Sequence, residues 1–259
     1  MCDFGASAES YFSVQALDQA SQGPIVATPT VHMPPDYPRF SVTPMPGTRY
    51  YVGFDLGQRQ SHSALIVLER VEVSNQKRDP VTFAWIKETY FNLKRIERFP
   101  LDMTYDDTAH KIRNTLECLG TRDISLLVDA TGVGQSFLDI LRKASVPGHL
   151  MPIHITAGGL PSFAHFVQRV AKSDLLSAAN YVMTSDCFRV PSGLAGAADL
   201  RREMEAYHVK PSASGHQRFT SNTTDDLVMA FSLAAWQARR FISDSGAPRN
   251  PGGWILNVP

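Results

Sequence analysis

Aspartates at three places far apart along the chain carry the side chains best suited to chemistry. Asp55 ends one apolar run, Asp129 ends another, and the pair Asp225-Asp226 opens an apolar helix near the C-terminus. A carboxylate at a strand end faces the crevice where ligands of open α/β sheets bind. Several carboxylates gathered there repel one another unless a divalent cation neutralises them. The pattern therefore predicts a metal site on an α/β sheet.

Each aspartate also has a purely structural explanation when it is taken alone. Asp55 precedes Gly57 and could close a turn, and Asp129 could cap a following helix. Asp225 and Asp226 would stabilise a helix start through the helix dipole, typically by ~0.3–1 kcal/mol. These alternatives stay open at the level of single residues.

The helix that follows Asp226 bears on which member of the acidic pair is the ligand. Ala230, Leu233 and Ala234 lie four, seven and eight positions after Asp226, on its face of the helix. Because two of these three residues are alanines, that face could pack closely against a sheet. We expect Asp226 to point towards the sheet, with Asp225 as the alternative.

The pattern of apolar residues predicts the elements that must position these aspartates. Three strands are expected in succession, then alternating helices and strands, then helices. The strands are predicted over 50–55, 63–71, 81–91, 124–129 and 150–156, and the helices over 105–119, 135–144, 172–183, 193–207 and 225–241. This order predicts an α/β fold: a mixed sheet with antiparallel edge strands, a parallel half and flanking helices.

A proline-rich stretch over residues 24–48 divides the chain. Proline lacks a backbone donor and has a fixed φ, so this stretch can form neither a central strand nor a helix interior. We expect residues 1–48 to be an N-terminal segment and linker, 49–243 to be one domain, and 244–259 to be a C-terminal tail.

Composition narrows the possible classes of protein. The 25 basic residues balance 25 acidic ones, so no global positive charge indicates a polyanionic partner. Bound metal ions could supply local positive charge that the sequence lacks. The three cysteines lie far apart without a CxxC pair, which argues against a disulfide framework or a zinc cage. Without an apolar run of ~18 residues or a secretory signal, the chain is expected to be intracellular with no membrane partner.

Five stretches, taken in order, resemble the nuclease domain of phage large terminase subunits, an RNase H-like fold related to Holliday-junction resolvases. They are Tyr51–Gln58, Arg98–Leu101, Leu127–Gly134, Lys172–Leu175 and Thr224–Ala230. The resemblance covers roughly residues 50 to 240, and its most specific parts are the glycine-rich segment after Asp129 and the Asp225-Asp226 helix start. It implies an endonuclease that cleaves double-stranded DNA during phage DNA packaging, in the cytoplasm of a bacterial host.

The resemblance also implies a catalytic set and its cofactors. Asp55, Asp129 and Asp226 would be the catalytic residues and would hold two Mg²⁺ or Mn²⁺ ions, with Asp225 as a further metal ligand. Asp55 would bridge the ions. Two divalent ions ~3.5–4 Å apart can activate a water and stabilise the leaving oxygen of a phosphodiester. The residues expected to contact DNA phosphates are Arg59, Arg95 and Lys172.

The sequence departs from a complete terminase in one important way. It contains no GxxxxGK[ST] loop, which is the signature of the ATPase motor. We therefore expect the partners to be double-stranded DNA and, by resemblance, a separate terminase ATPase, the small terminase subunit or a portal.

Two other classes of protein compete with the nuclease. Phe54–Gly57 and Asp129–Gly132 also resemble the two phosphate loops of sugar kinases and actin-like ATPases, although Gln58–Gln60 replaces their usual serine or threonine hairpin tip. The other rival is a non-catalytic RNase H-like docking module, which would have no need of a carboxylate cluster. Nucleotide binding and metal-dependent cleavage separate the three.

Overall fold

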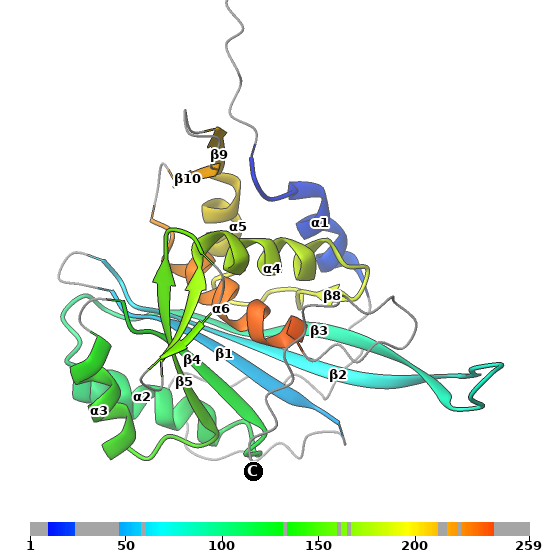
Figure 1. Ribbon diagram of the computed structural model, residues 1–259, viewed down its shortest axis with the longest axis horizontal. Coiled ribbons are helices and arrows are strands. Elements are labelled where there is room, and N and C mark those ends of the chain that lie inside the picture. The colour runs from blue at the N-terminus through cyan, green and yellow to red at the C-terminus, as the bar shows by residue number, and fades with distance from the viewer. Residues whose placement is uncertain are drawn as a thin grey trace, which may run out of the picture.

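The central element is a mixed sheet with helices on both faces (Figure 1). The computed structural model describes residues 10–23, 47–57, 61–131, 134–159, 162–164, 167–211, 217–221 and 224–240. Within these ranges eight strands form the main sheet, in the order β6-β7-β5-β4-β1-β2-β3-β8, and β9 and β10 form a separate hairpin.

The elements have the following bounds. The strands are β1 (Arg49–Asp55), β2 (Ala64–Arg78), β3 (Trp85–Arg98), β4 (Ile124–Asp129), β5 (His149–Thr156), β6 (Ser162–Ala164), β7 (Val167–Ala171), β8 (Phe188–Arg189), β9 (Tyr207–Pro211) and β10 (Gln217–Ser221). The helices are α1 (Val14–Gln22), α2 (Tyr105–Glu117), α3 (Gly134–Lys143), α4 (Lys172–Thr184), α5 (Ala197–Glu205) and α6 (Asp226–Arg240).

The pairing of the strands confirms the predicted fold class. Strands β1, β2 and β3 pair antiparallel, whereas β1, β4, β5 and β7 run parallel to one another. The parallel half places the carboxyl ends of β1 and β4 at the same edge of the sheet, which is where Asp55 and Asp129 lie.

Alternating side chains of the central strands fill two hydrophobic layers. On β1, Val52 and Phe54 are buried on the face covered by α2 and α3, while Tyr51 is buried on the other face. That second face is covered by α6, with α4, α5 and α1 packed around it (Figure 1). The layer against α6 is the one that matters for the site, because α6 begins at Asp226.

The hairpin of β2 and β3 differs from the prediction. The strands were predicted over 63–71 and 81–91, but the first extends to Arg78 and the second begins at Trp85, so the turn runs from Asp79 to Ala84. This end of the hairpin projects from the body (Figure 1). Val81 and Phe83 are 82% and 69% exposed, so no burial pattern marks the strand ends there.

Six elements of the described ranges were not predicted: α1, the strand pair β6 and β7, the short strand β8, and the two strands of the β9–β10 hairpin. The predicted helix over 193–207 is shorter, because Gly196 in a left-handed conformation precedes α5 and β9 begins at Tyr207. No helix in the described ranges is both long and apolar enough to cross a membrane. Most of the predicted linker (24–46) and the predicted tail (244–259) lie outside the described residues.

Candidate active site

Asp55 and Asp129 end neighbouring parallel strands. Phe54 of β1 is in register with Val128 of β4, so the next residue on each strand is the aspartate. Adjacent strands lie ~4.8 Å apart, which makes the two carboxylates neighbours at this edge. Both side chains are half-buried, as expected for the ends of strands that are otherwise buried. The predicted placement of this pair is confirmed.

Gly53 brings α6 onto the sheet beside Asp55. A Cβ on Gly53 would stand 1.8 Å from the carbonyl oxygen of Ala230 and 2.9 Å from the amide nitrogen of Ala234. No side chain fits in that space, so the glycine allows the helix backbone to lie directly on β1. The prediction that the alanine face of α6 packs closely against the sheet is confirmed.

The two aspartates at the start of α6 have different surroundings. Asp226 is only 6% exposed, and its Oδ2 atom is buried without a hydrogen-bond partner among the described residues. Asp225 is half-buried and accepts an ion-pair hydrogen bond from Lys172 Nζ at 3.0 Å. The structure thus brings both residues to the site, and Asp226 is the one with an unsatisfied buried oxygen.

The electrostatics show that the four aspartates act on one another. Burial raises the pKa of Asp55 well above its ordinary 3.8, and the charges of Asp129, Asp226 and Asp225 raise it further. The ammonium of Lys172 works in the opposite direction. Asp55 is therefore close enough to the other three aspartates for their negative charges to disfavour its ionised form.

Asp129 and Asp226 also hold a raised pKa, mainly because each is buried. For Asp129 the effect is offset by the backbone N–H of Thr131, which donates to Oδ1 at 2.8 Å, and by His154 and Lys172. For Asp226 the charge of Arg98 offsets burial, whereas Asp225 adds to it. Positive charge at this site would stabilise all three carboxylates.

Three residues near the site were not singled out from the sequence: Arg98, His62 and His154. Arg98 ends β3 in the same cross-sheet row as Asp55, because Ala64 pairs with both. His62 is half-buried beside the carbonyl oxygen of Phe99, which lies 2.9 Å from its Nδ1 atom, and it is near enough to Asp226 to favour the charged form of that carboxylate. The signal for Arg98 was available, since it opens one of the stretches that carry the resemblance.

The donor set suits a hard divalent cation. Its oxygens belong to carboxylates, which are ligands that Mg²⁺ and Mn²⁺ prefer. One of these oxygens, Asp226 Oδ2, is buried without a hydrogen-bond partner among the described residues. No group of three His, Cys, Asp or Glu side chains in the described ranges stands close enough to hold one ion. Mg²⁺ is usually bound by one or two carboxylates together with waters and substrate phosphates, so pairs of these aspartates fit it.

Solved structures with the same arrangement of elements were found by comparison. The large terminase nuclease from thermophilic phage G20c, with bound magnesium, aligns with a TM-score of 0.54 and 22% identity over 89% of this chain and 98% of its own. The cobalt-bound form of the same nuclease also aligns with a TM-score of 0.54 and 22% identity, over 89% of this chain and 98% of its own. The chain has the fold of a large terminase nuclease. The nuclease domain from Thermus phage P74-26 aligns similarly, with a TM-score of 0.51, 21% identity, and coverage of 87% and 94%.

Comparison of sequences adds nothing to this result, since no family model and no curated protein matches the chain. At 21–22% identity the similarity establishes the terminase-nuclease fold, which agrees with the resemblance inferred from five short stretches.

The basic residues expected to bind DNA lie in different parts of this terminase-nuclease fold. Lys172 is at the start of α4 beside Asp225, within the site. Arg95 forms an ion pair with Glu97, with 2.6 Å between Nη2 and Oε2. Glu97 also pairs with Lys111 of α2, so this group of charges lies on the sheet face opposite α6. Arg59 lies outside the described residues. Their contacts with DNA stay predictions.

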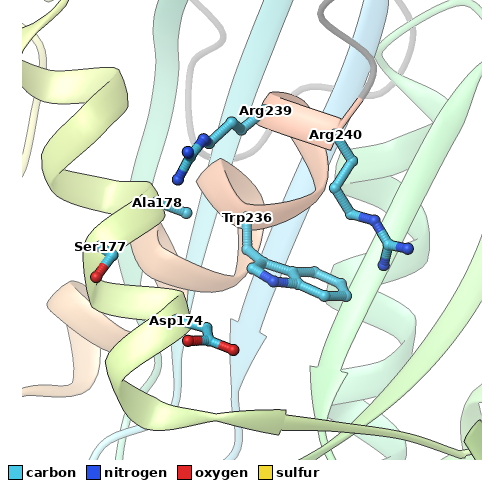
Figure 2. Close-up of a pocket in the computed structure, with 6 residues that line it drawn as sticks. All are labelled: Asp174, Ser177, Ala178, Trp236, Arg239 and Arg240. Atoms are coloured by element: carbon cyan, nitrogen blue, oxygen red, sulfur yellow. The ribbon is translucent and has the colours of Figure 1, made fainter. Parts of the chain in front are cut away.

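The terminase-nuclease fold also has a hollow between α4 and the C-terminal part of α6. It has a volume of about 280 Å³ and is lined by Asp174, Ser177, Ala178, Trp236, Arg239 and Arg240. Figure 2 shows Arg239 and Arg240 extending in different directions from the helix end, with Trp236 between them. Trp236, the lining residue of α6 nearest to Asp226 in sequence, follows it by ten residues, or ~15 Å of helix, and none of the four aspartates lines the hollow.

Proposed function

We propose that this chain is a metal-dependent endonuclease that cleaves double-stranded DNA, as the nuclease part of a phage DNA-packaging terminase. The observation that carries the proposal is the cluster of Asp55, Asp129, Asp225 and Asp226, drawn from β1, β4 and α6 to one edge of the sheet. The magnesium- and cobalt-bound nucleases of phage G20c, which share the fold, support it.

The cluster would hold two Mg²⁺ or Mn²⁺ ions. Asp55 would be shared between them, because β1 pairs with β4, which ends at Asp129, and packs against α6, which begins at Asp226. Asp129 would hold one ion, and Asp226, or Asp225 in its place, would hold the other. When bound, the ions would supply an activated water and charge stabilisation at the scissile phosphate. Without positive charge the cluster is self-repelling, and this property distinguishes it from a set of structural aspartates.

The remaining polar residues would orient the substrate. Lys172, half-buried at the start of α4, keeps its ammonium at the site because Asp225 and Tyr207 raise its pKa above 10.5, although burial alone would lower it. Its position suits it to contact a DNA phosphate beside the aspartates. We propose cutting without strong sequence preference, because a phosphate contact positions DNA without reading its bases.

The partners proposed for the chain follow from the same fold. Double-stranded DNA would be the substrate. A terminase ATPase, the small terminase subunit or a portal would bring DNA to it. Its place of action would be the cytoplasm of a bacterial host during phage assembly.

Cleavage of a supercoiled plasmid tests the proposal. Purified protein with Mn²⁺ or Mg²⁺ should convert the plasmid to nicked and linear forms, and EDTA should stop the reaction. Asp129→Asn should abolish cleavage, whereas Asp139→Asn, an exposed aspartate on α3, should leave it unchanged. A plasmid that stays supercoiled at high protein and ample Mn²⁺ would contradict catalysis and favour a docking module.

A further inference from the structure

The start of α6 is capped in an unusual way. A helix leaves its first backbone N–H groups without partners, and the residue just before the helix commonly accepts from one of them through its own side chain. Asp225 occupies that position in α6, but its carboxylate is paired with Lys172 instead. The N–H groups of Leu227 and Val228 therefore need another acceptor.

Glu203 of α5 is that acceptor. Its Oε2 atom accepts hydrogen bonds from Leu227 N at 3.0 Å and Val228 N at 3.1 Å, and the side chain is only 3% exposed. A negative charge here also lies at the positive end of the helix dipole. A carboxylate more than 20 residues away in sequence thus does the work that the Asp225 side chain would otherwise do.

The other oxygen of Glu203 is held from the sheet. Arg98 Nη2 forms an ion pair with Glu203 Oε1, and the hydroxyl of Thr224 donates to the same oxygen at 3.1 Å. Arg98 lies at the end of β3 in the row that contains Asp55. One continuous chain of contacts therefore links the sheet edge, Arg98, Glu203 and the first turn of α6.

We propose that Glu203, held by Arg98, is a positioning residue that fixes the first turn of α6, so that the unpartnered carboxylate oxygen of Asp226 stays available for a metal ion. This inference rests on the proposed function, because it assigns Glu203 a role in the same metal site. Glu203 does not contact the metal or DNA. It acts through the backbone of the two residues that follow Asp226.

Manganese binding to two Glu203 variants tests this role. Calorimetric titration with Mn²⁺ should show Glu203→Ala binding at least about tenfold more weakly than the parent, the size expected when a residue that orients a ligand is lost. Glu203→Gln keeps an oxygen for the N–H groups but loses the Arg98 ion pair, so its loss should be smaller, about threefold. Glu205→Ala, on the exposed side of the same helix, is the matched control and should bind like the parent.

Hydrogen exchange provides a readout that needs no metal. In Glu203→Ala the amides of Leu227 and Val228 should exchange about tenfold faster, because their acceptor is gone. In Glu205→Ala they should exchange as in the parent.

The outcomes separate this inference from the proposed function. A Glu203 variant that is folded and binds Mn²⁺ as tightly as the parent overturns the positioning role alone, even if its melting temperature is lower. If Glu203→Ala does not fold, Glu203→Gln decides, and parent-like affinity in that variant overturns the role. A parent protein that binds no Mn²⁺ overturns the metal site and this inference with it.

Discussion

The carbonyl oxygen of Ala230 lies 1.8 Å from the point where a Cβ on Gly53 would stand. This contact joins β1 to α6 two residues before Asp55 and one turn after Asp226. The separation between these two aspartates is therefore set by backbone packing, since neither chain can move closer and no side chain fits between them.

Gly53→Ala should push α6 away from β1. Backbone atoms cannot yield as a flexible side chain can, so we expect a loss of about 1–3 kcal/mol in the free energy of unfolding, or about 2–4 °C in Tm for each kcal/mol. Gly158→Ala is the control, because a Cβ there meets nothing within 4 Å. Thermal unfolding of both variants is the measurement, and equal melting temperatures would show that α6 does not depend on this contact.

Asp55→Asn should leave the metal-free protein as stable as the parent or more stable. Its raised pKa means that the folded protein resists ionisation of this carboxyl more than the unfolded chain does. The free energy of unfolding of the parent therefore falls as pH rises from the ordinary pKa of 3.8 through the raised pKa. The stability gained by the variant over the parent should shrink as pH falls through the same range. Melting curves in EDTA across this range test the sign. A variant that unfolds at neutral pH would make Asp55 a structural residue.

Asp226→Asn should weaken Mn²⁺ binding more than Asp225→Asn. The buried Oδ2 of Asp226 has no partner among the described residues, whereas Asp225 is paired with Lys172 and more exposed. We expect a loss of at least about tenfold for Asp226→Asn and about threefold for Asp225→Asn, in the range seen when metal sites are perturbed. Calorimetric titration of both proteins checks the order. The reverse order would assign the third ligand to Asp225.

Lys172→Met should reduce the salt dependence of DNA binding. If the ammonium contacts one phosphate, the slope of the logarithm of affinity against the logarithm of salt concentration should fall by about 1. Lys143→Met, an exposed lysine at the end of α3, should leave the slope unchanged. Titrations in Ca²⁺, chosen to limit cleavage, give both slopes. An unchanged slope in Lys172→Met would confine this lysine to its ion pair with Asp225.

Parts of the site that depend on local pattern could be predicted from the sequence. Asp55 and Asp129 end short apolar runs that are typical of buried strands. Their position at the carboxyl ends of neighbouring strands could therefore be predicted from the pattern. The alanines at 230 and 234 mark a helix face that can approach a sheet closely, and Gly53 proved to be its counterpart.

Other parts depend on contacts between distant residues, which a single sequence does not show. Arg98 and Glu203 are 105 residues apart, and nothing in the local sequence of either residue indicates that they pair. The lengths of β2 and β3 were underestimated because their outer part is exposed and lacks an alternation of buried and exposed residues. The strands of the β6–β7 and β9–β10 pairs have five residues or fewer, which is too short to show a period of buried and exposed residues.

Anomalous diffraction from crystals soaked in Mn²⁺ tests the central claim most directly, because it locates the ions without assuming activity. Two anomalous peaks are expected about 3.5–4 Å apart, both contacting Asp55, with Asp129 at one and Asp226 at the other. No peak within coordination distance of Asp55 at saturating Mn²⁺, in crystals with the aspartates accessible, would contradict the metal centre and with it the proposed nuclease.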